Sequence, residues 1–428
     1  MTAARAKQIE LQSLELAGII RRGDTVMWGQ SVAEPLPLTQ ALAEQRQAIG
    51  RFGVFLGVTL SENLRPEHAD CIAFSAYCGN GSNRAFARAG VLDILPVHYS
   101  QLPALLLSGR LKIDVLMLQL APADAQGNYS LSMAHEYLVP AIRTARVVIA
   151  EVNDQAPWTF GECSVRDEDL DYIVRTSRPP LELHQPAAGP AELAVANRVA
   201  GLIEDGSTLQ FGLGALPEAV LSALAGHRDL GIHSGAIGDK VADLMEAGVI
   251  TNARKNIDRG VAVAGVMFGS KRIQQFCHRN PAVQFRSTAY THDPAVLAGL
   301  DRFVALNSAI EVDLTGQVCA DSIGFNQYSG VGGQMDFIRG ASLSEGGKPI
   351  IAIASRTAKG ISRIVPALKP GAGVVTTRAH IHYVVTEFGV ANLYGKNLSQ
   401  RAKALIDIAH PDDRELLEKA SWERFHHS

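Results

Sequence analysis

The sequence predicts an α/β protein built from two similar domains with mainly parallel sheets. Short apolar runs alternate along the whole chain with segments of helical periodicity, which is typical of repeated strand–helix units. The runs are apolar at nearly every position, as expected of strands covered by helices on both faces. The chain has 428 residues, more than one hydrophobic core usually serves, so two domains are expected.

Six strands are expected in chain order. The two in the first half are VLMLQL at 115–120 and VVIAEV at 147–152. The four in the second half are TLQFGL at 208–213, VAVAGVMF at 261–268, PIIAIA at 349–354 and GVVTT at 373–377. Apolar residues at helical spacing predict helices over 193–202, 218–224, 240–247 and 398–408.

A domain boundary is expected where the helical and strand patterns stop. The segment 175–192, RTSRPPLELHQPAAGPAE, is rich in proline and has little periodicity, which is typical of a linker. The sequence therefore predicts domains at 1–183 and 184–428. Each half has its own strands and a loose scheme of strand, glycine-rich turn and helix, although no clean sequence repeat joins them.

Composition narrows the class of function. Hydrophobic residues make up 47% of the chain, charged residues 19%, and the net charge is −3. This balance argues against a nucleic-acid surface and against a polybasic membrane anchor. No apolar stretch approaches the roughly 20 residues that a membrane span needs, and the N-terminal segment lacks the apolar run of a signal peptide. We expect a cytoplasmic protein.

The cysteines indicate neither a disulfide framework nor a zinc site. They are odd in number, scattered and without C-x-x-C spacing, so we expect reduced thiols. They are Cys71, Cys78, Cys163, Cys277 and Cys319.

Two glycine-rich turns are the strongest candidates for ligand contact. Gly330, Gly332 and Gly333 precede Gln334 in S-G-V-G-G-Q, and successive backbone N–H groups in such a turn suit an oxyanion or a phosphate. Gly212 and Gly214 follow a predicted strand and precede a predicted helix, which suits close approach of backbone to a ligand. The dinucleotide-binding fingerprint is excluded, because Pro217 stands at its third glycine.

The pattern S-G-V-G-G-Q-x-D-F-x-R-G-A at 329–341 resembles the acetyl-CoA hydrolase/CoA-transferase family, which includes acetate and 4-hydroxybutyrate CoA-transferases. Further matches at 115–129, 147–155 and 171–179 extend the resemblance to both halves. It implies a CoA-transferase-like N-terminal domain, a CoA-binding C-terminal domain and an active site in the cleft between them. Acyl-CoA is the implied substrate, with no metal, and a homodimer or larger assembly is implied.

One position departs from the family's chemistry. The family carries its catalytic glutamate in G-I-H-T-E, whereas this chain has G-I-H-S-G, ending in Gly235. In the family that carboxylate attacks the thioester and passes through an anhydride to a glutamyl-CoA. Glycine has no side chain to attack with, and it permits a positive φ that glutamate tolerates poorly. His233 lies in the same segment and is the remaining catalytic candidate, but adjacent Ser234 points to the opposite face of a strand.

Other side chains have weaker assignments. Asp239 has its own family counterpart and is not a relocated glutamate. Lys359 and Arg363, beside Gly360, resemble a family segment and could meet CoA phosphates. The turn at 80–84 resembles a family turn on the acyl side. Six acids could replace the glutamate: Glu34, Glu136, Glu311, Asp313, Asp321 and Glu387.

Three functions remain open at this point. The resemblance implies CoA transfer between an acyl-CoA and a carboxylate, which Gly235 opposes unless the substrate carries the missing carboxylate. A hydrolase that cuts a thioester or a C–C bond with water needs an oxyanion hole and a base, but no enzyme carboxylate. A non-catalytic CoA-binding or regulatory protein is the third.

Overall fold

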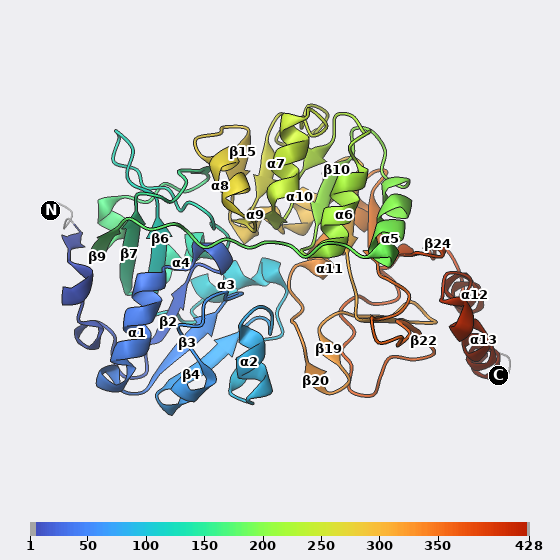
Figure 1. Cartoon of the computed structure of the whole chain (residues 1–428), viewed down its shortest axis with the longest axis horizontal. Helices are drawn as coiled ribbons and strands as arrows, with labels where there is room; N and C mark the ends of the chain where they lie inside the picture. The colour runs from blue at the N-terminus through green and yellow to red at the C-terminus, as the bar shows by residue number, and fades with distance from the viewer. Residues whose placement is uncertain (1–5, 426–428) are drawn as a thin grey trace. The chain divides into compact units, whose positions relative to one another are not determined.

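A computed structural model of the chain describes residues 6–425, which form two compact units (Figure 1). Unit 1 comprises the described residues up to His184 together with 237–239 and 263–291. Unit 2 comprises 185–236, 240–262 and the described residues from His292 onward. The predicted α/β class is confirmed, and the chain leaves unit 1 within the proline-rich segment, then returns to it twice.

Unit 1 is built on an eight-stranded sheet in the order β1-β9-β7-β6-β2-β3-β4-β5, in which every neighbouring pair is parallel. The central strand β6 has six residues, and all are buried, which explains its continuous apolar sequence. The strands are β1 Lys7–Gln8, β2 Thr25–Trp28, β3 Phe52–Leu56, β4 Ile72–Ala76, β5 Leu92–Ile94, β6 Val115–Leu120, β7 Val147–Asn153 and β9 Tyr172–Thr176.

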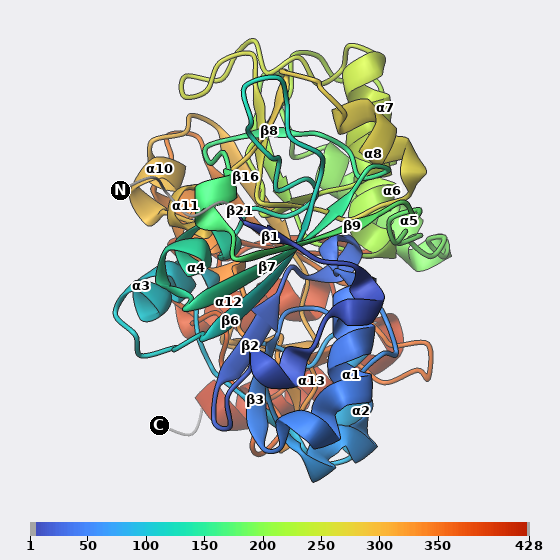
Figure 2. The ribbon, with the colours of Figure 1, turned by 90° about the vertical axis from the view of Figure 1, so that its left-hand side faces the viewer.

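Helices cover both faces of this sheet. In Figure 2, α1 (Leu36–Ile49) and α2 (Asn83–Arg88) lie on one side of the strands, and α3 (Leu102–Leu107) and α4 (Leu138–Thr144) on the other. Buried leucines of α1 share a hydrophobic cluster with β2 and β3. The returning segment carries α8 (Lys271–Cys277), α9 (Thr288–Thr291) and the short strand β15 (Val283–Phe285), which pairs in parallel with β8 (Phe160–Gly161).

Unit 2 has a six-stranded sheet in the order β11-β10-β16-β21-β23-β24. The first five strands are parallel, and β24 returns antiparallel to β23. The strands are β10 Thr208–Phe211, β11 Gly231–Ile232, β16 Phe303–Asn307, β21 Lys348–Ala352, β23 Tyr383–Thr386 and β24 Gly389–Asn392. The parallel arrangement brings the carboxyl ends of β10, β11 and β16 to one edge.

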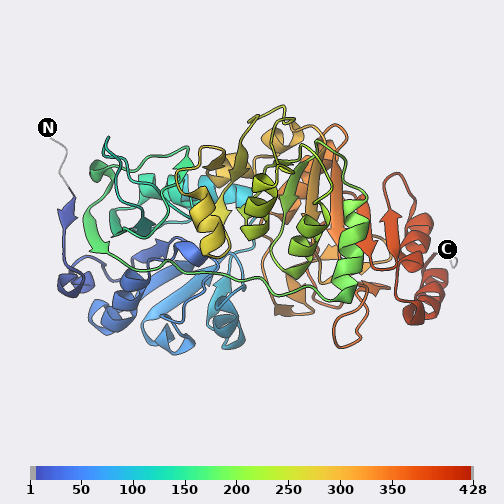
Figure 3. The same ribbon diagram turned by 45° about the horizontal axis from the view of Figure 1, so that its top comes forward.

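The helices of unit 2 pack directly on this sheet. The green helices α5 (Pro190–Ala200) and α6 (Ala215–Ala223) lie in front of the strands in Figure 3. A separate cluster of Leu297, Leu300, Phe337 and Ala341 packs α10 (Pro294–Ala298) and α11 (Gln334–Leu343) against β16. The remaining helices are α7 Asp239–Glu246, α12 Leu398–Asp407 and α13 Pro411–Phe425. No helix among residues 6–425 is long and apolar enough to cross a membrane.

Of the six predicted strands, one is divided into two and one is wrong. The run 261–268 is divided at Gly265 into β13 (Ala262–Ala264) and β14 (Val266–Met267), which join different sheets. The break is stabilised because the Gly265 carbonyl accepts a hydrogen bond from the His135 N–H, at 3.0 Å. The run 373–377 forms only an isolated bridge between Thr376 and Val318. The other four strands and the four predicted helices are present, with ends shifted by a few residues.

The segment that leaves unit 1 is anchored to the sheet by a buried ion pair. Glu151 of β7 is fully buried, and the Arg178 guanidinium binds it through two contacts, Nε to Oε1 at 2.7 Å and Nη2 to Oε2 at 2.8 Å. Thr176 donates a further hydrogen bond to the same carboxylate, at 2.7 Å. Removing the arginine would leave a buried carboxylate without its counter-ion.

We therefore expect Arg178→Ala to lower the free energy of unfolding by about 3–5 kcal/mol, the usual cost of breaking a buried ion pair. Arg228→Ala is the matched control, because the Arg228–Asp205 pair is 82% and 41% exposed and should contribute only about 0–1 kcal/mol. Urea unfolding followed by circular dichroism measures both. Equal losses in the two variants would contradict the anchoring role of Arg178.

Candidate functional site

The glycine-rich turn after β10 and the histidine segment after β11 lie side by side in unit 2. The two strands are parallel neighbours, with Leu209 opposite Ile232, and the chain reaches Gly212 after one strand and His233 and Gly235 after the other. The carboxyl edge of a parallel sheet is where ligands usually bind in α/β proteins. The structure thus brings three predicted site residues to one edge.

Gly214 has a backbone that only glycine adopts readily. Its φ of 122° and ψ of 179° lie in a region that is essentially restricted to glycine, and it is the N-cap of α6. A Cβ added there would meet no atom within 4 Å. The glycine is therefore required by backbone conformation, and the space beside it is open.

The second glycine-rich turn leads into α11. Gly332 has a φ of 57°, and an added Cβ would again meet no atom within 4 Å. Gly333 is the N-cap of α11, and Gln334 begins the helix and donates from its side-chain amide to Thr376 Oγ1 at 3.2 Å. Gly330 lies partly buried in the loop before them.

The space beside Gly235 is filled by His292. A Cβ added to Gly235 would lie 3.0 Å from both Cε1 and Nε2 of His292, closer than the roughly 3.5–4.0 Å of an ordinary contact. Gly235 does not have a positive φ, so the expected backbone obstacle to a glutamate is absent. The obstacle is steric, and no local sequence pattern indicates it.

Both histidines of this region are buried. His233 donates its backbone N–H to the Leu209 carbonyl at 3.1 Å, and its ring lies edge-on to Phe303. Burial, with a smaller contribution from the neighbouring His233, lowers the pKa of His292 to about 3. His292 is therefore neutral at physiological pH. Ser234 turns toward β10, where its hydroxyl lies 3.4 Å from the Phe211 backbone.

Lys359 is exposed in a tight turn. Gly360 of this turn has a φ of 73°, and its N–H donates to the Thr357 carbonyl at 2.9 Å. Arg363 lies nearby in sequence, partly buried, with a long contact of 3.5 Å from Nη1 to the Ala309 carbonyl. An exposed ammonium on a glycine turn suits a phosphate group.

The acids weighed as substitutes for the glutamate have structural partners. In unit 2, Glu311 is paired with Lys369, Asp313 accepts from Thr315 and Gln317, Asp321 accepts from Ser322, and Glu387 accepts from Ser355. In unit 1, Glu34 accepts from Ser61. Asp239, which is not one of these acids, also has a partner, since both of its oxygens accept from the Ser270 N–H at the start of α8.

Glu136 forms the core of a buried polar cluster in unit 1. Gln30 donates to both carboxylate oxygens at 2.8 Å, and Tyr99 donates to one of them at 2.9 Å. The Gln30 carbonyl in turn accepts from Tyr77 at 2.7 Å and from the Val58 N–H at 2.9 Å. Gln30, Val58 and Tyr77 follow the carboxyl ends of β2, β3 and β4. Burial raises the pKa of Glu136 to about 8, so the side chain holds a proton at neutral pH.

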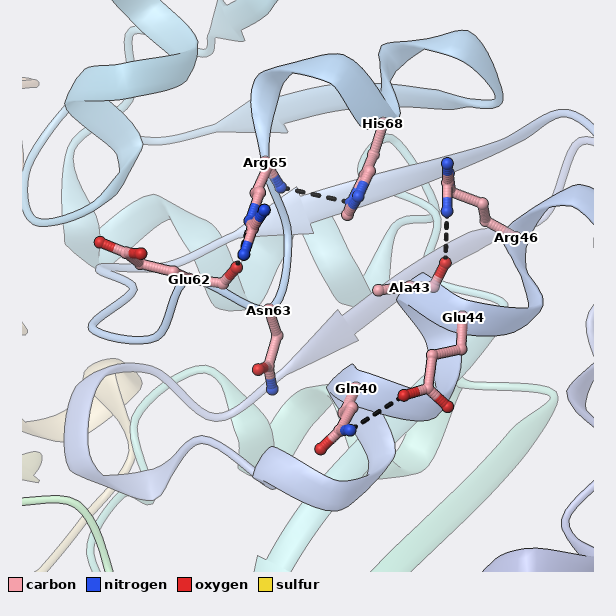
Figure 4. A pocket seen from close by; sticks show the side chains of 8 residues that line it. All are labelled: Gln40, Ala43, Glu44, Arg46, Glu62, Asn63, Arg65 and His68. Atoms are coloured by element: carbon pink, nitrogen blue, oxygen red, sulfur yellow. Dashed lines mark hydrogen bonds between the residues drawn. The ribbon is translucent and has the colours of Figure 1, made fainter.

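A polar surface pocket of about 390 Å³ also opens in unit 1, away from every predicted site residue. Figure 4 shows its side chains occupied with one another: Gln40 donates to Glu44, Arg65 Nε donates to the Glu62 carbonyl, and Arg46 donates to the Ala43 carbonyl. These internal bonds leave little chemistry for a ligand, and we assign the pocket no function.

Family models match both halves of the chain. The acetyl-CoA hydrolase/transferase N-terminal domain matches residues 6–181. The acetyl-CoA hydrolase/transferase C-terminal domain matches residues 269–421, which include the α11 turn and Lys359.

Similar proteins agree with these matches. The 4-hydroxybutyrate coenzyme A transferase of Clostridium kluyveri is 42% identical over 413 residues, 95% of either chain. The succinyl-CoA:acetate/propanoyl-CoA:succinate CoA transferase of Fasciola hepatica is 44% identical over 347 residues, 80% of this chain and 73% of the relative. Among solved structures, RipA from Yersinia pestis superposes with a TM-score of 0.92 at 34% identity, covering 98% of both chains.

The Glu136 cluster makes stability depend on pH. Because the folded-state pKa of about 8 lies above the ordinary 4.5, the stabilising contribution is complete below about pH 4.5 and is lost as pH rises through about 8. We expect the unfolding free energy of the native protein, relative to Glu136→Gln, to fall across this window by up to about 1.4 kcal/mol per pH unit. Chemical unfolding of both proteins between pH 5 and 8 measures it. A difference that stays constant with pH would contradict a buried protonated Glu136.

Proposed function

This chain belongs to the acetyl-CoA hydrolase/transferase family, and we propose that it cleaves acyl-CoA thioesters with a nucleophile that comes from outside the protein. The family assignment makes it an enzyme that acts on CoA thioesters. The proposal concerns the attacking group, which in the family resemblance is a glutamate of the chain and here is a carboxylate substrate or water.

The single observation that carries the proposal is the contact between Gly235 and His292. If position 235 were only a glycine with empty space beside it, another side chain of the protein could enter that space, or a Gly235→Glu substitution could fill it. Here an imidazole lies 3.0 Å from the position of the missing Cβ, so a glutamate at 235 would press against the ring and require it to shift. The acids weighed as substitutes in unit 2 already hold partners of their own.

The proposed reaction needs no covalent enzyme intermediate. An acceptor carboxylate attacks the thioester carbonyl, the carbonyl π pair moves to oxygen, and the pair returns as the C–S bond breaks and CoA leaves as a thiolate. The thiolate then attacks the acceptor carbonyl of the resulting anhydride and releases the original acyl group as a carboxylate. With water as nucleophile, the same first step ends in a free acid and CoA.

The acceptor class follows from the relatives. Their names specify 4-hydroxybutyrate, succinate and acetate, so we propose short carboxylates for this chain. We propose that the thioester lies against the turns at 212–214 and 330–333, whose open glycines permit close backbone approach. Lys359 is proposed to meet a CoA phosphate. A cytoplasmic homodimer or larger assembly is part of the same proposal.

The glycine turn before α11 provides a binding test. Gly332→Leu should keep the fold but weaken acyl-CoA binding by about tenfold or more, because the side chain enters the open space beside the turn. Gly395→Leu is the matched control in unit 2, since Gly395 has a φ of 72° and equally open surroundings. Both variants should lose about 1–2 kcal/mol of stability from a positive φ. Calorimetric titration with acetyl-CoA measures affinity, and equal affinity in both variants would contradict the placement.

The nature of the nucleophile is tested by trapping. Incubation with acyl-CoA, followed by borohydride or hydroxylamine and peptide mass spectrometry, should modify no glutamate. Turnover should nevertheless occur, and comparison of rates with and without short carboxylates distinguishes transfer from hydrolysis. A trapped glutamate would show that another carboxylate of the chain attacks. Tight binding of every acyl-CoA without turnover would favour a regulatory CoA-binding protein.

A further inference from the structure

His292 lies where two glycines from distant parts of the chain leave room for it. A Cβ on Gly235 would be 3.0 Å from its Nε2, and a Cβ on Gly333 would be 2.6 Å from the same atom. Any other residue at either position would press a side chain into the imidazole. Nε2 is therefore the ring atom that lies close to the added Cβ of both glycines.

The ring is held by aromatic packing. Phe337 of α11 lies against it with ring centroids 4.5 Å apart and planes tilted by 50°, and Phe303 of β16 packs behind Phe337 at 6.4 Å. On the backbone side, the next residue, Asp293, caps α10 by accepting from the N–H groups of Ala295 and Val296. A ring held by these contacts can present one nitrogen in a fixed direction.

The chemistry of the ring follows from its burial. Only 3% of His292 is exposed, and burial disfavours an imidazolium because the charged ring would lose its hydration. A neutral imidazole has one nitrogen that donates a hydrogen bond and one that accepts. Neutral histidines of this kind can polarise a substrate carbonyl by donating a hydrogen bond, without giving up the proton.

We propose that His292 is a catalytic residue, whose Nε2–H donates a hydrogen bond to the thioester carbonyl oxygen of acyl-CoA at the place vacated by the family's glutamate. This inference rests on the proposed function and deepens it. As the external nucleophile forms its C–O bond, the carbonyl π pair moves to oxygen, and the hydrogen bond stabilises the developing oxyanion. The pair returns to carbon when CoA leaves as a thiolate, and the histidine ends with its own proton.

Two substitutions distinguish a hydrogen-bonding role of the His292 ring nitrogens from a role in which the ring only fills space. His292→Phe keeps an aromatic ring but removes both nitrogens, whereas His292→Gln keeps an N–H donor near the position of Nε2. We expect His292→Phe to retain acyl-CoA binding and to lose about 100-fold or more in kcat, as for loss of one oxyanion donor, with partial recovery in His292→Gln. His227→Phe is the control for a general histidine-to-phenylalanine effect, because the His227 ring bonds to the Ile203 carbonyl at 3.1 Å and was not predicted to be part of the site.

The carbonyl itself provides a readout that a structural role would not change. Infrared difference spectra of acyl-CoA labelled with ¹³C at the carbonyl should show a lower stretching frequency on the native protein and on His292→Gln than on His292→Phe. Equal frequencies on the native protein and His292→Phe, or a kcat of His292→Phe that matches His227→Phe, would overturn the role of His292. A native protein that binds acyl-CoA but turns over none would overturn the proposed function instead.

The steric part of the inference has its own test. Gly235→Glu alone should yield little trapped glutamyl-CoA, because its Cβ presses against the imidazole at 3.0 Å. Combining Gly235→Glu with His292→Ala clears that contact and should yield a glutamyl-CoA that hydroxylamine traps at position 235. Equal trapping in the single and the double variant would show that His292 does not occupy the place of the nucleophile.

Discussion

The imidazole of His292 occupies the space that a side chain at position 235 or 333 would need. The ring fits only because neither Gly235 nor Gly333 carries a Cβ, and a side chain at position 235 fits only if the ring moves away. A Cβ at position 333, 2.6 Å from the ring, would force it to move, and a Cβ at position 235, 3.0 Å away, would require a shift of a few tenths of an ångström in a closely packed interior. The chemistry open to the chain depends on which group occupies the space, a carboxylate or an imidazole.

In the proposed function, with an imidazole there, electrostatic stabilisation and positioning replace covalent catalysis. A glutamate nucleophile divides CoA transfer into two half-reactions, so each substrate can bind in turn. An external nucleophile must be present together with acyl-CoA, which places more of the barrier reduction on orientation and on oxyanion donors. The turns at 214 and 332 suit orientation of the substrate and oxyanion stabilisation by backbone groups. The space beside both turns is open, and both positions have a positive φ that favours glycine.

The sequence predicted those parts of the fold and site that leave a local pattern. The strand at 115–120 was found because all six side chains are buried, and the glycine turns at 212–214 and 330–333 were found because their glycines cluster next to strand and helix signals. The run 261–268 was predicted as one strand because its composition does not reveal the division at Gly265. Short strands such as β2 and β3 carry too few residues for a clear period.

His292 could not be predicted, since its role depends on three segments that meet only in the folded chain. Nothing in the local sequence distinguishes it from an ordinary histidine before a helix cap. The sequence did indicate that Gly235 is unusual, but it suggested a backbone conformation as the obstacle to a glutamate. The fold assigns that obstacle to a side chain 57 positions away in the numbering of the chain, His292 against Gly235.

A crystal structure with a slowly reacting acyl-CoA analogue bound would test the account most directly. The decisive quantity is which protein atoms lie within about 3–3.5 Å of the carbonyl group, the approach distance of a reacting pair. We expect His292 Nε2 within hydrogen-bond distance of the carbonyl oxygen, and no glutamate or aspartate oxygen within about 3–3.5 Å of the carbonyl carbon. A carboxylate oxygen of the protein in line with the carbonyl carbon, with His292 displaced from it, would contradict the central claim.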